Sequence, residues 1–451
     1  MLLGSATIQA LGKEASVQLV TSFEALLQSL SPVMTAPSFQ TWLVLLTGWV
    51  FAPRRTVTRM IVAAGAVEQK HFSSFHRFFS QAAWSRDELG LTLFGLVRVW
   101  LGATIFLGVD DTLARKRGLK MFGTGMHHDP LLSSRSYTVT NWGHCWVVLS
   151  VLVAFPFWPG RYFSLPILFR LYLNKKKAKK LRRAYRSKPE LTVEMLKLLC
   201  ARHENLHFHV VGDSAYGGQS VLGQLPRNCD LSSRLLLTAR LHDAPPEAQP
   251  GRRGRPRRRG RKLPTPRQML AEHCRHVELS IYGRSQRARV AEVLGRVYAV
   301  PERPLKVVAV EALAGGRGQE AFYSTCVTAT AEEILTWYSM RWAVEVTFHD
   351  SKQHLGFEQP QGWSRRAVER TAPMAMLLYA LIVHWYALAG HRHESLPMFP
   401  WYAAKSRASF ADMLATLRRV SLRQRISALG LSGRGSRKIQ ELLENLATLA
   451  A

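Results

Sequence analysis

The order of short apolar runs between residues 103 and 213 restricts the fold more than any other feature of the sequence. Four runs of strand length lie at residues 103–109, 145–155, 162–173 and 208–213. A helix is expected between the third and fourth runs, over residues 193–200, with Thr192 as its N-cap. Three strands, a helix and a further strand are the order of a mixed α/β domain, so we predict that fold class.

Aspartates stand at the ends of two of these runs. Asp110 and Asp111 follow the first run, and Asp213 ends the fourth. A buried strand delivers such side chains to the edge of a sheet. Because side chains alternate along a strand, Asp110 and Asp111 cannot share one face, and the alternation alone does not decide which of them belongs with Asp213.

A helix is predicted from near residue 330 to residue 355, and it carries an unusual set of side chains. Tyr338, Arg341, Glu345 and Lys352 fall within about 60° of one face at roughly 100° per residue. A solvent-exposed, salt-bridged helix has similar pairs. It would not place a tyrosine and an arginine ahead of a glutamate in a chain with two strand-end aspartates.

Three carboxylates from two strand ends and a helix indicate a metal site. Carboxylate oxygens are hard ligands that hold Mg²⁺. Two such ions about 4 Å apart activate the attacking water and stabilise the leaving 3′ oxygen in phosphodiester cleavage. Arginine and lysine beside them would grip phosphates, the first as a bidentate fork and the second as a point charge.

The charge balance indicates a polyanionic partner. Lysine and arginine total 61 against 31 acidic residues, a net charge of +30. Double-stranded DNA is the expected partner, with an anionic membrane or a basic surface that binds nothing as alternatives. The apolar stretch 374–389 contains His384 and is shorter than the roughly 20 residues of a membrane span, so we expect a buried core helix. The scattered cysteines fit a reducing cytoplasm.

Residues 243–268 form a break in composition that is rich in proline and arginine, and we expect a flexible loop there. Arg253 and Arg255 resemble the core of an AT-hook, which lies in a narrow minor groove; a nonspecific phosphate-binding loop is the alternative. The stretch 203–207 is a formal H-E-x-x-H, but its second histidine already belongs to the fourth strand run, which argues against a zinc site.

The motif Tyr338-x2-Arg341-x3-Glu345-x6-Lys352 resembles the Y-R-E-K signature of bacterial insertion-sequence transposases of the DDE type. Asp111-Thr112 and Gly212-Asp213 match the context of the two aspartates in that group. The resemblance implies an RNase H-like mixed sheet flanked by helices, with a β-rich insertion before the glutamate. Apolar residues at helical spacing, among them Phe23, Leu26 and Leu30, separately predict an all-helical N-terminal domain. The resemblance also implies cut-and-paste transposition by a homodimer that holds two transposon ends.

By the same resemblance, Asp111, Asp213 and Glu345 are the catalytic residues and the ligands of two Mg²⁺ ions, for which Mn²⁺ can substitute. Tyr338, Arg341 and Lys352 would contact DNA. Trp342 would stack on an unpaired base, or else pack in the core. Arg253 and Arg255 are the further candidates for DNA contact.

We therefore predict a bacterial, cytoplasmic, nucleoid-associated DNA transposase that does not act on membranes. A DNA-binding protein that has lost catalysis and an endonuclease without strand transfer are the alternatives. The expected domains are a helical N-terminal DNA-binding domain (1–95), the first part of the catalytic core (96–228), a basic loop with a β-rich insertion (229–328), the second part of the core (329–395) and a basic helical C-terminal region (396–451).

Overall fold

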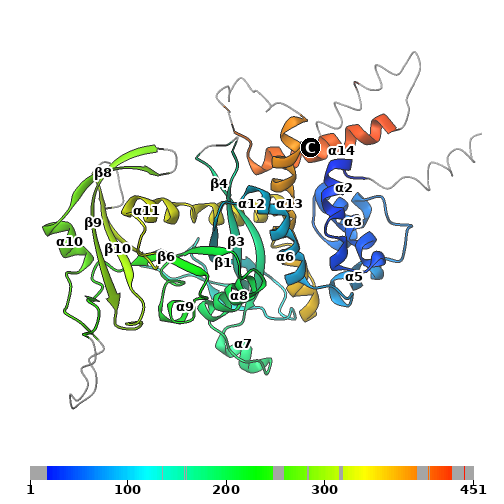
Figure 1. Cartoon of the computed structure of the whole chain (residues 1–451). Coiled ribbons are helices and arrows are strands. Elements are labelled where there is room, and N and C mark those ends of the chain that lie inside the picture. Colours follow the sequence, from blue (N-terminus) through cyan, green and yellow to red (C-terminus); the bar gives the residue numbers. More distant parts are fainter. Residues whose placement is uncertain are drawn as a thin grey trace, which may run out of the picture. The chain divides into compact units, whose positions relative to one another are not determined.

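The computed structural model describes residues 18–428 apart from 135, 157, 159, 247–258, 282–283, 314–317, 394–404 and 406, together with residue 441. The chain forms two compact units (Figure 1). The sheet unit comprises Arg98–Leu113 and His144–Val346. The helical unit comprises the described residues up to Val97, the segment Ala114–Gly143 and the described residues from Thr347 onward.

The core of the sheet unit is a mixed sheet in the strand order β4-β3-β1-β5-β6. β3 and β4 pair antiparallel, whereas β1 pairs parallel with β5 and β5 parallel with β6. Numbered within this core, the order is 3-2-1-4-5, which is that of the RNase H-like fold. The predicted fold class is thus confirmed. The five strands are β1 (Thr104–Arg115), β3 (Thr140–Ala154), β4 (Tyr162–Tyr172), β5 (His207–Gly212) and β6 (Cys229–Leu235).

A β-rich insertion follows the core strands, as expected. Antiparallel strands continue the sheet beyond β6, in the order β11-β10-β9, and β8 pairs with β9. β6 lies inside the segment predicted as insertion, but its parallel pairing with β5 places it in the core sheet. The insertion elements are β7 (Leu241–His242), α10 (Pro266–Glu272), β8 (Arg275–Ile281), β9 (Arg284–Val297), β10 (Leu305–Ala312) and β11 (Gln319–Ser324).

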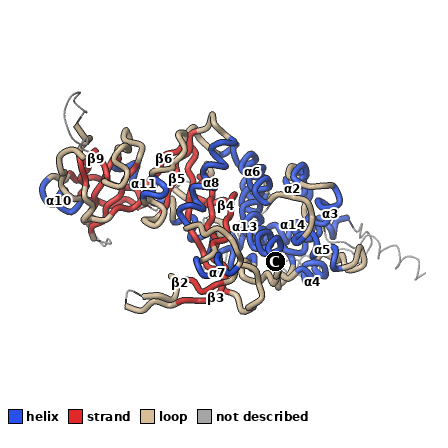
Figure 2. The backbone as a smooth tube through the Cα atoms, turned by 90° about the horizontal axis from the view of Figure 1, so that it is seen from below, coloured by secondary structure: helices blue, strands red, loops and turns tan. Residues whose placement is uncertain are grey.

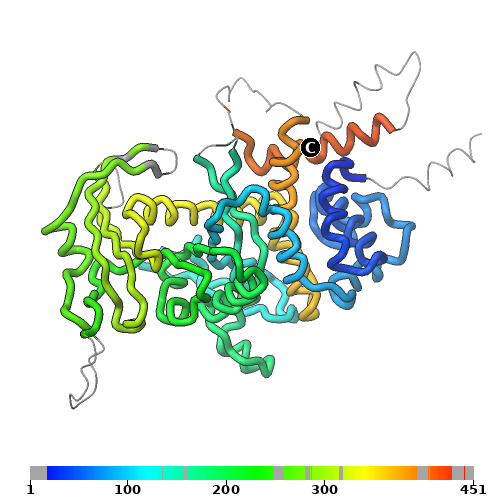
Figure 3. The backbone as a smooth tube through the Cα atoms, viewed as in Figure 1, coloured from blue at the N-terminus to red at the C-terminus, as the bar shows by residue number. Residues whose placement is uncertain are grey.

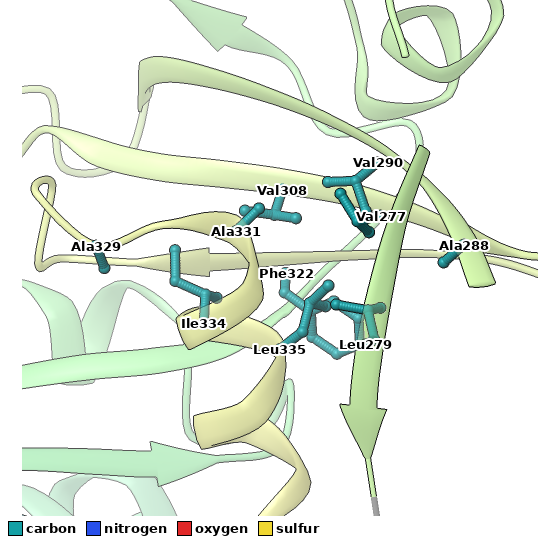
Figure 4. Close-up of a cluster of buried hydrophobic side chains, with 10 residues drawn as sticks. All are labelled: Val277, Leu279, Ala288, Val290, Val308, Phe322, Ala329, Ala331, Ile334 and Leu335. Carbon is teal, nitrogen blue, oxygen red and sulfur yellow. The ribbon is translucent and has the colours of Figure 1, made fainter. Parts of the chain in front are cut away.

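The insertion shares a hydrophobic core with the helix that follows it. Ile334 and Leu335 of α11 (Ala331–Ser339) pack with side chains of β8, β9, β10 and β11 (Figure 4). Phe322 of β11 belongs to the same cluster, and its ring lies 4.6 Å from that of Tyr338. The insertion is therefore fixed to the helix that leads into the motif containing Glu345.

The single long helix predicted from residue 330 is two helices in the structure. α11 ends at Ser339 and α12 runs from Trp342 to Leu355. Backbone bonds from Arg341 N–H to the Tyr338 carbonyl (3.2 Å) and from Val344 N–H to the Arg341 carbonyl (2.9 Å) link residues three apart. This tighter turn breaks the α-helical repeat, so Tyr338 does not share a continuous helix face with Glu345.

Helix α8 (Lys188–Arg202) begins five residues before the start predicted from Thr192 as N-cap. Ser187 is the N-cap and forms a capping box with Glu190, and a proline occupies the first turn. These signals together start a helix more strongly than a lone threonine. Thr192 is buried inside the helix. The sheet unit also contains η2 (Arg98–Trp100), α7 (Lys175–Lys180) and α9 (Gln219–Leu222).

The helical unit combines described helices from the N-terminal and C-terminal parts of the chain (Figure 2). Trp49 Nε1 donates to the Leu355 carbonyl at 2.8 Å, and Arg418 Nε donates to the Val50 carbonyl at 2.7 Å. The predicted N-terminal domain 1–95 is therefore not an independent unit, because C-terminal helices cover its apolar faces. Its elements are α2 (Thr21–Gln28), η1 (Ser31–Val33), α3 (Ala36–Phe51), α4 (Val57–Ala63), α5 (Phe72–Ser80), α6 (Arg86–Val97), β2 (Gly125–His128), α13 (Arg365–Leu388), η3 (Gly390–Arg392) and α14 (Phe410–Ala428).

Helix α13 includes the apolar stretch predicted as a core helix. The helix is long and apolar enough to cross a membrane, but 94% of its most apolar 18-residue stretch is buried inside the protein. Trp42 Nε1 of α3 contacts Met374 Sδ at 3.2 Å, and the ring of Phe23 packs edge-on against Trp385. The expectation of a buried core helix is confirmed.

Replacement of Ile334 by alanine tests the shared core of the insertion and α11. Ile334 is fully buried, so Ile334→Ala should lower the free energy of unfolding by about 2–4 kcal/mol through reduced burial and a residual cavity. Urea denaturation measures this change. The matched control is Thr336→Ala on the same helix, at a half-buried position outside the cluster. Equal effects of the two variants would contradict the proposed packing.

Candidate active site

Asp110 and Asp111 lie within β1, directly after the residues that pair with β5, and their side chains have different surroundings. The strand continues to Arg115, so the prediction that both aspartates follow the end of the strand is wrong. Asp110 contacts Arg341, and Asp111 contacts Lys188, Tyr216 and Cys145. This difference follows from the alternation of side chains along a strand. Asp110 is therefore the aspartate on the side of β1 that meets Arg341.

Asp110 lies on the face of the sheet that meets α12. Arg341 donates from Nη1 to Asp110 Oδ2 at 2.7 Å and from Nη2 to Glu345 Oε1 at 2.7 Å. One guanidinium therefore holds the strand carboxylate and the helix carboxylate together. Both Arg341 and Asp110 are largely buried, with side-chain exposures of 17% and 16%.

A glycine allows α12 to approach β1 closely enough for this contact. Gly108 precedes Asp110 by two residues and faces the same side of the strand. A Cβ atom at Gly108 would lie 2.6 Å from Cγ2 of Val344, the residue before Glu345. A side chain at position 108 would therefore force Val344, and α12 with it, to move away from β1.

Asp213 follows β5, the strand that pairs with β1 in parallel. Its Oδ1 accepts from Ala215 N–H at 2.9 Å, and its carbonyl accepts from the Ser233 hydroxyl at 2.8 Å. The parallel register, with Val109 opposite Gly212, brings Asp213 to the same end of the sheet as Asp110. Asp213 is near enough to raise the pKa of Asp110.

Asp111 is not on the face that carries Glu345, contrary to the sequence-based prediction. Its Oδ2 accepts from Lys188 Nζ at 2.6 Å and from Cys145 Sγ at 3.3 Å, and its Oδ1 accepts from the Tyr216 hydroxyl at 2.6 Å. Tyr216 is fully buried and belongs to the turn that starts at Asp213. Asp111 therefore ties β1 to α8 and to the turn after β5.

Burial and charge shift the ionisation of this region. Burial raises the pKa of the Asp110 carboxyl to about 7; Arg341 opposes this shift, and Asp111 and Asp213 add to it. Burial lowers the pKa of Arg341, but Asp110, Tyr338 and Glu345 outweigh it and raise that pKa overall. Burial likewise lowers the pKa of Lys188, while Cys145 and Asp111 raise it further than burial lowers it. The cations therefore stay charged.

The other predicted DNA contacts lie in different settings. Tyr338 packs on Phe322, and the Arg341 guanidinium carbon is 5.8 Å from its ring centroid. Trp342 is 48% exposed, so it is not part of the hydrophobic core. Lys352 follows Glu345 by about two turns of α12. Arg253 and Arg255 lie outside the described residues.

Residues 29–293 match the family described as DDE superfamily endonuclease, which is more than half of the 451-residue chain. This chain belongs to the DDE superfamily endonuclease family. Asp110, Asp111 and Asp213 fall within the matched residues of this DDE endonuclease, and Glu345 lies beyond them.

The sequence has no match among curated proteins. Among solved structures, the DDE endonuclease is similar to a cryo-EM structure of the piggyBac transposase synaptic complex with hairpin DNA. The two chains share 10% sequence identity and a TM-score of 0.40, and the similarity covers 94% of this chain and 81% of the other.

DDE endonucleases use divalent metal ions, and the residues gathered here fit that use. In the part of the chain that the structure describes, no three acidic, histidine or cysteine side chains are already grouped closely enough to hold a metal. However, the Arg341 guanidinium is a cation that joins Asp110 to Glu345, with Asp213 close by. Carboxylate oxygens are hard ligands of the kind that divalent cations of this class prefer.

Two features of this site were not predicted from the sequence. Lys188 carries no local signal, because its contact with Asp111 depends on how α8 packs on the sheet. Asp110 had a local signal: Gly108, an isolated glycine inside an apolar strand, marks the close approach of another element. Residues on the same face as that glycine are the ones that meet the helix.

Replacement of Gly108 by alanine tests the contact between β1 and α12. The added methyl group would collide with the buried Val344, so Gly108→Ala should lower the free energy of unfolding by about 1–3 kcal/mol. It should also reduce cleavage of DNA, because Glu345 is displaced from Asp110. Thermal unfolding and a nicking assay measure the two effects.

Gly102→Ala is the matched control, because a Cβ atom at Gly102 would meet nothing within 4 Å. Equal stability and equal nicking for the two glycine variants would contradict the close approach.

Proposed function

We propose that this DDE endonuclease is the transposase of a bacterial insertion sequence, which cuts DNA at the ends of its element and joins those ends to target DNA. The observation that carries the proposal is the pairing of Asp110 on β1 with Glu345 on α12 through Arg341, beside Asp213 on the neighbouring strand. The Y-R-E-K motif and the net charge of +30 support it.

In this proposal Asp110, Asp213 and Glu345 hold the divalent ions, and Asp110 replaces Asp111 in the set predicted from the sequence. Bound Mg²⁺ ions would lower the pKa of an attacking water and stabilise the leaving 3′ oxygen. Asp111 becomes a positioning residue: by accepting from Tyr216 and Lys188, it holds β1 and the turn after β5 in place.

Arg341 is suited to bind DNA as well as to hold the carboxylates. Its Nε is buried without a hydrogen-bond partner among the described residues, although both Nη atoms are paired. A buried donor without a partner costs stability, and a phosphate oxygen would satisfy it. The exposed Trp342 beside it offers a surface for an unstacked base. Lys352, in the last turn of α12, is a further candidate for contact with the DNA backbone.

The reaction has two phosphoryl transfers. In the first, water attacks the phosphorus at the element's end, the bond to the 3′ oxygen breaks, and a 3′-hydroxyl and a 5′-phosphate remain. In the second, that 3′-hydroxyl attacks a target phosphodiester, a new bond to phosphorus forms, and a target 3′-hydroxyl leaves. Each step exchanges one bond to phosphorus for another. We propose that a homodimer holds the two ends during both steps.

Substitution of the two adjacent aspartates tests the proposed site. Asp110→Asn should reduce Mg²⁺-dependent nicking of DNA carrying the element's ends by more than about 100-fold, because partners that merely orient metal ligands already contribute 10–100-fold. Asp111→Asn should retain most nicking and mainly lower the unfolding temperature, because Lys188 loses its charged partner.

Binding of Mn²⁺ to the same two variants, measured by calorimetry, provides a readout that a stability defect does not imitate. Weakened Mn²⁺ binding is expected for Asp110→Asn alone. The reverse ranking, with nicking and metal binding abolished in Asp111→Asn and kept in Asp110→Asn, would refute the assignment.

A strand-transfer assay tests the second half of the proposed reaction. Wild-type protein, Mg²⁺ and DNA with a pre-cut element end should give products joined covalently to a target plasmid, and Glu345→Gln should give none. Nicking without joined products would show an endonuclease rather than a transposase. Tight binding without nicking, with the correct ends supplied, would show a DNA-binding protein that has lost catalysis.

A further inference from the structure

The segment between β4 and α8 carries an unusual density of positive charge, which the proposed active site does not use. Residues 174–189 contain no aspartate or glutamate. Among its cations, six are exposed on α7 and the turn after it: Lys175, Lys176, Lys179, Lys180, Arg182 and Arg183. We call residues 175–186 the basic arm. It projects from the rest of the sheet unit below α8 (Figure 3).

Specific contacts hold the basic arm in a defined conformation. Asn174 caps α7 by accepting from Lys177 N–H at 2.9 Å, and Ala178 is buried. Lys175 Nζ lies 5.5 Å from the ring centroid of Tyr185, which closes the two ends of the arm on each other. A short helix with this much like charge repels itself, so such anchors are needed to hold the cations together.

The turn after α7 places an arginine where glycine is preferred. Arg182 has φ of 51°, and it is the one non-glycine residue with positive φ in the described part of the chain. Arg183 N–H donates to the Ala178 carbonyl and Arg182 N–H to the Lys179 carbonyl, the hydrogen bonds of a Schellman motif. The left-handed conformation is unfavourable for a residue with a Cβ atom. Residues in such strained conformations are found preferentially at functional sites, and here the strained residue is an exposed cation.

The C-terminal end of the basic arm is followed directly by α8, which contacts the core sheet. Arg186 pairs with Glu194 of α8, which also pairs with Arg170 of β4 at 2.8 Å. Lys188, two residues further, contacts Asp111 beside Asp110. Ion pairs on both sides of Ser187 therefore connect the C-terminal end of the arm to α8 and to Asp111 of β1, next to Asp110.

We infer that the basic arm is a binding surface for the phosphate backbone of double-stranded DNA, and that it holds the duplex next to the site of cleavage. The inference rests on the proposed function for the identity of the polyanion. A membrane fits less well, because the arm presents cations and one exposed tyrosine instead of the broad apolar face of a membrane-lying helix.

The test is equilibrium binding of a labelled DNA duplex, measured by fluorescence anisotropy without divalent metal so that no cleavage occurs. The arm variant is Lys175→Gln, Lys176→Gln, Lys179→Gln and Lys180→Gln combined. The control variant removes four exposed cations elsewhere in the sheet unit: Lys197→Gln, Arg227→Gln, Arg240→Gln and Arg287→Gln. Both variants lose the same net charge, so a difference between them reports the location of the charge.

We expect the arm variant to bind at least about tenfold more weakly than the control at physiological salt. A plot of the logarithm of the association constant against the logarithm of the salt concentration has a negative slope. Its magnitude should be smaller by about 0.9 for each phosphate that the arm variant no longer neutralises. Equal affinity and slope in the two variants would overturn the inference. So would a wild-type preference for anionic vesicles over the duplex, with only vesicle binding abolished in the arm variant.

Arg182→Gly separates a role in DNA binding from a structural role. Glycine adopts the left-handed conformation freely, so this variant should unfold at an equal or higher temperature than the wild type. If the arm binds DNA, the same variant should nevertheless bind the duplex a few-fold more weakly. Unchanged DNA affinity in Arg182→Gly together with unchanged affinity in the arm variant would exclude the arm.

These outcomes are independent of the test of the active site. If Asp110→Asn loses nicking but the arm variant binds DNA normally, the proposed function is supported and only the inference about the basic arm is wrong. Failure of the wild type to bind any duplex would remove the proposed function itself, and the arm's role with it.

Discussion

The arrangement of the site depends on one ion-pair bridge, in which Arg341 holds Asp110 of β1 and Glu345 of α12. Two buried or half-buried carboxylates repel each other, and burial with neighbouring aspartates already raises the pKa of Asp110. The guanidinium offsets that repulsion in the absence of any other cation. The protein thus has a preformed place for positive charge between a strand and a helix, in a family whose chemistry uses divalent metal.

Several other features of the sheet unit bring β1 and α12 together. Gly108 lets α12 approach β1, and the tight turn at Arg341 directs its side chain toward the strand. The β-rich insertion packs on α11, immediately before that turn, so the position of Glu345 depends on a core formed far away in sequence. On the other side of β1, Asp111 joins α8 and the turn after Asp213. The side chains of the two adjacent aspartates therefore contact different elements of the sheet unit.

Much of this arrangement could be predicted from the sequence, because it is local. Apolar runs ending in aspartate indicated the strands, and the spacing from Tyr338 to Lys352 indicated the residues of the helix motif. The break between α11 and α12 and the side of β1 that faces Glu345 depend on tertiary packing and could not be predicted from periodicity alone. The N-terminal helices were predicted as a domain, since no local pattern shows that α13 and α14 cover their apolar faces.

Anomalous diffraction from crystals containing Mn²⁺ would test the central claim most directly. We predict manganese bound by Asp110, Asp213 and Glu345, with Arg341 turned away from at least one of the carboxylates that it bridges. Lys188 should remain on Asp111. Manganese bound to Asp111, with Asp110 still paired to Arg341, would contradict the proposed site.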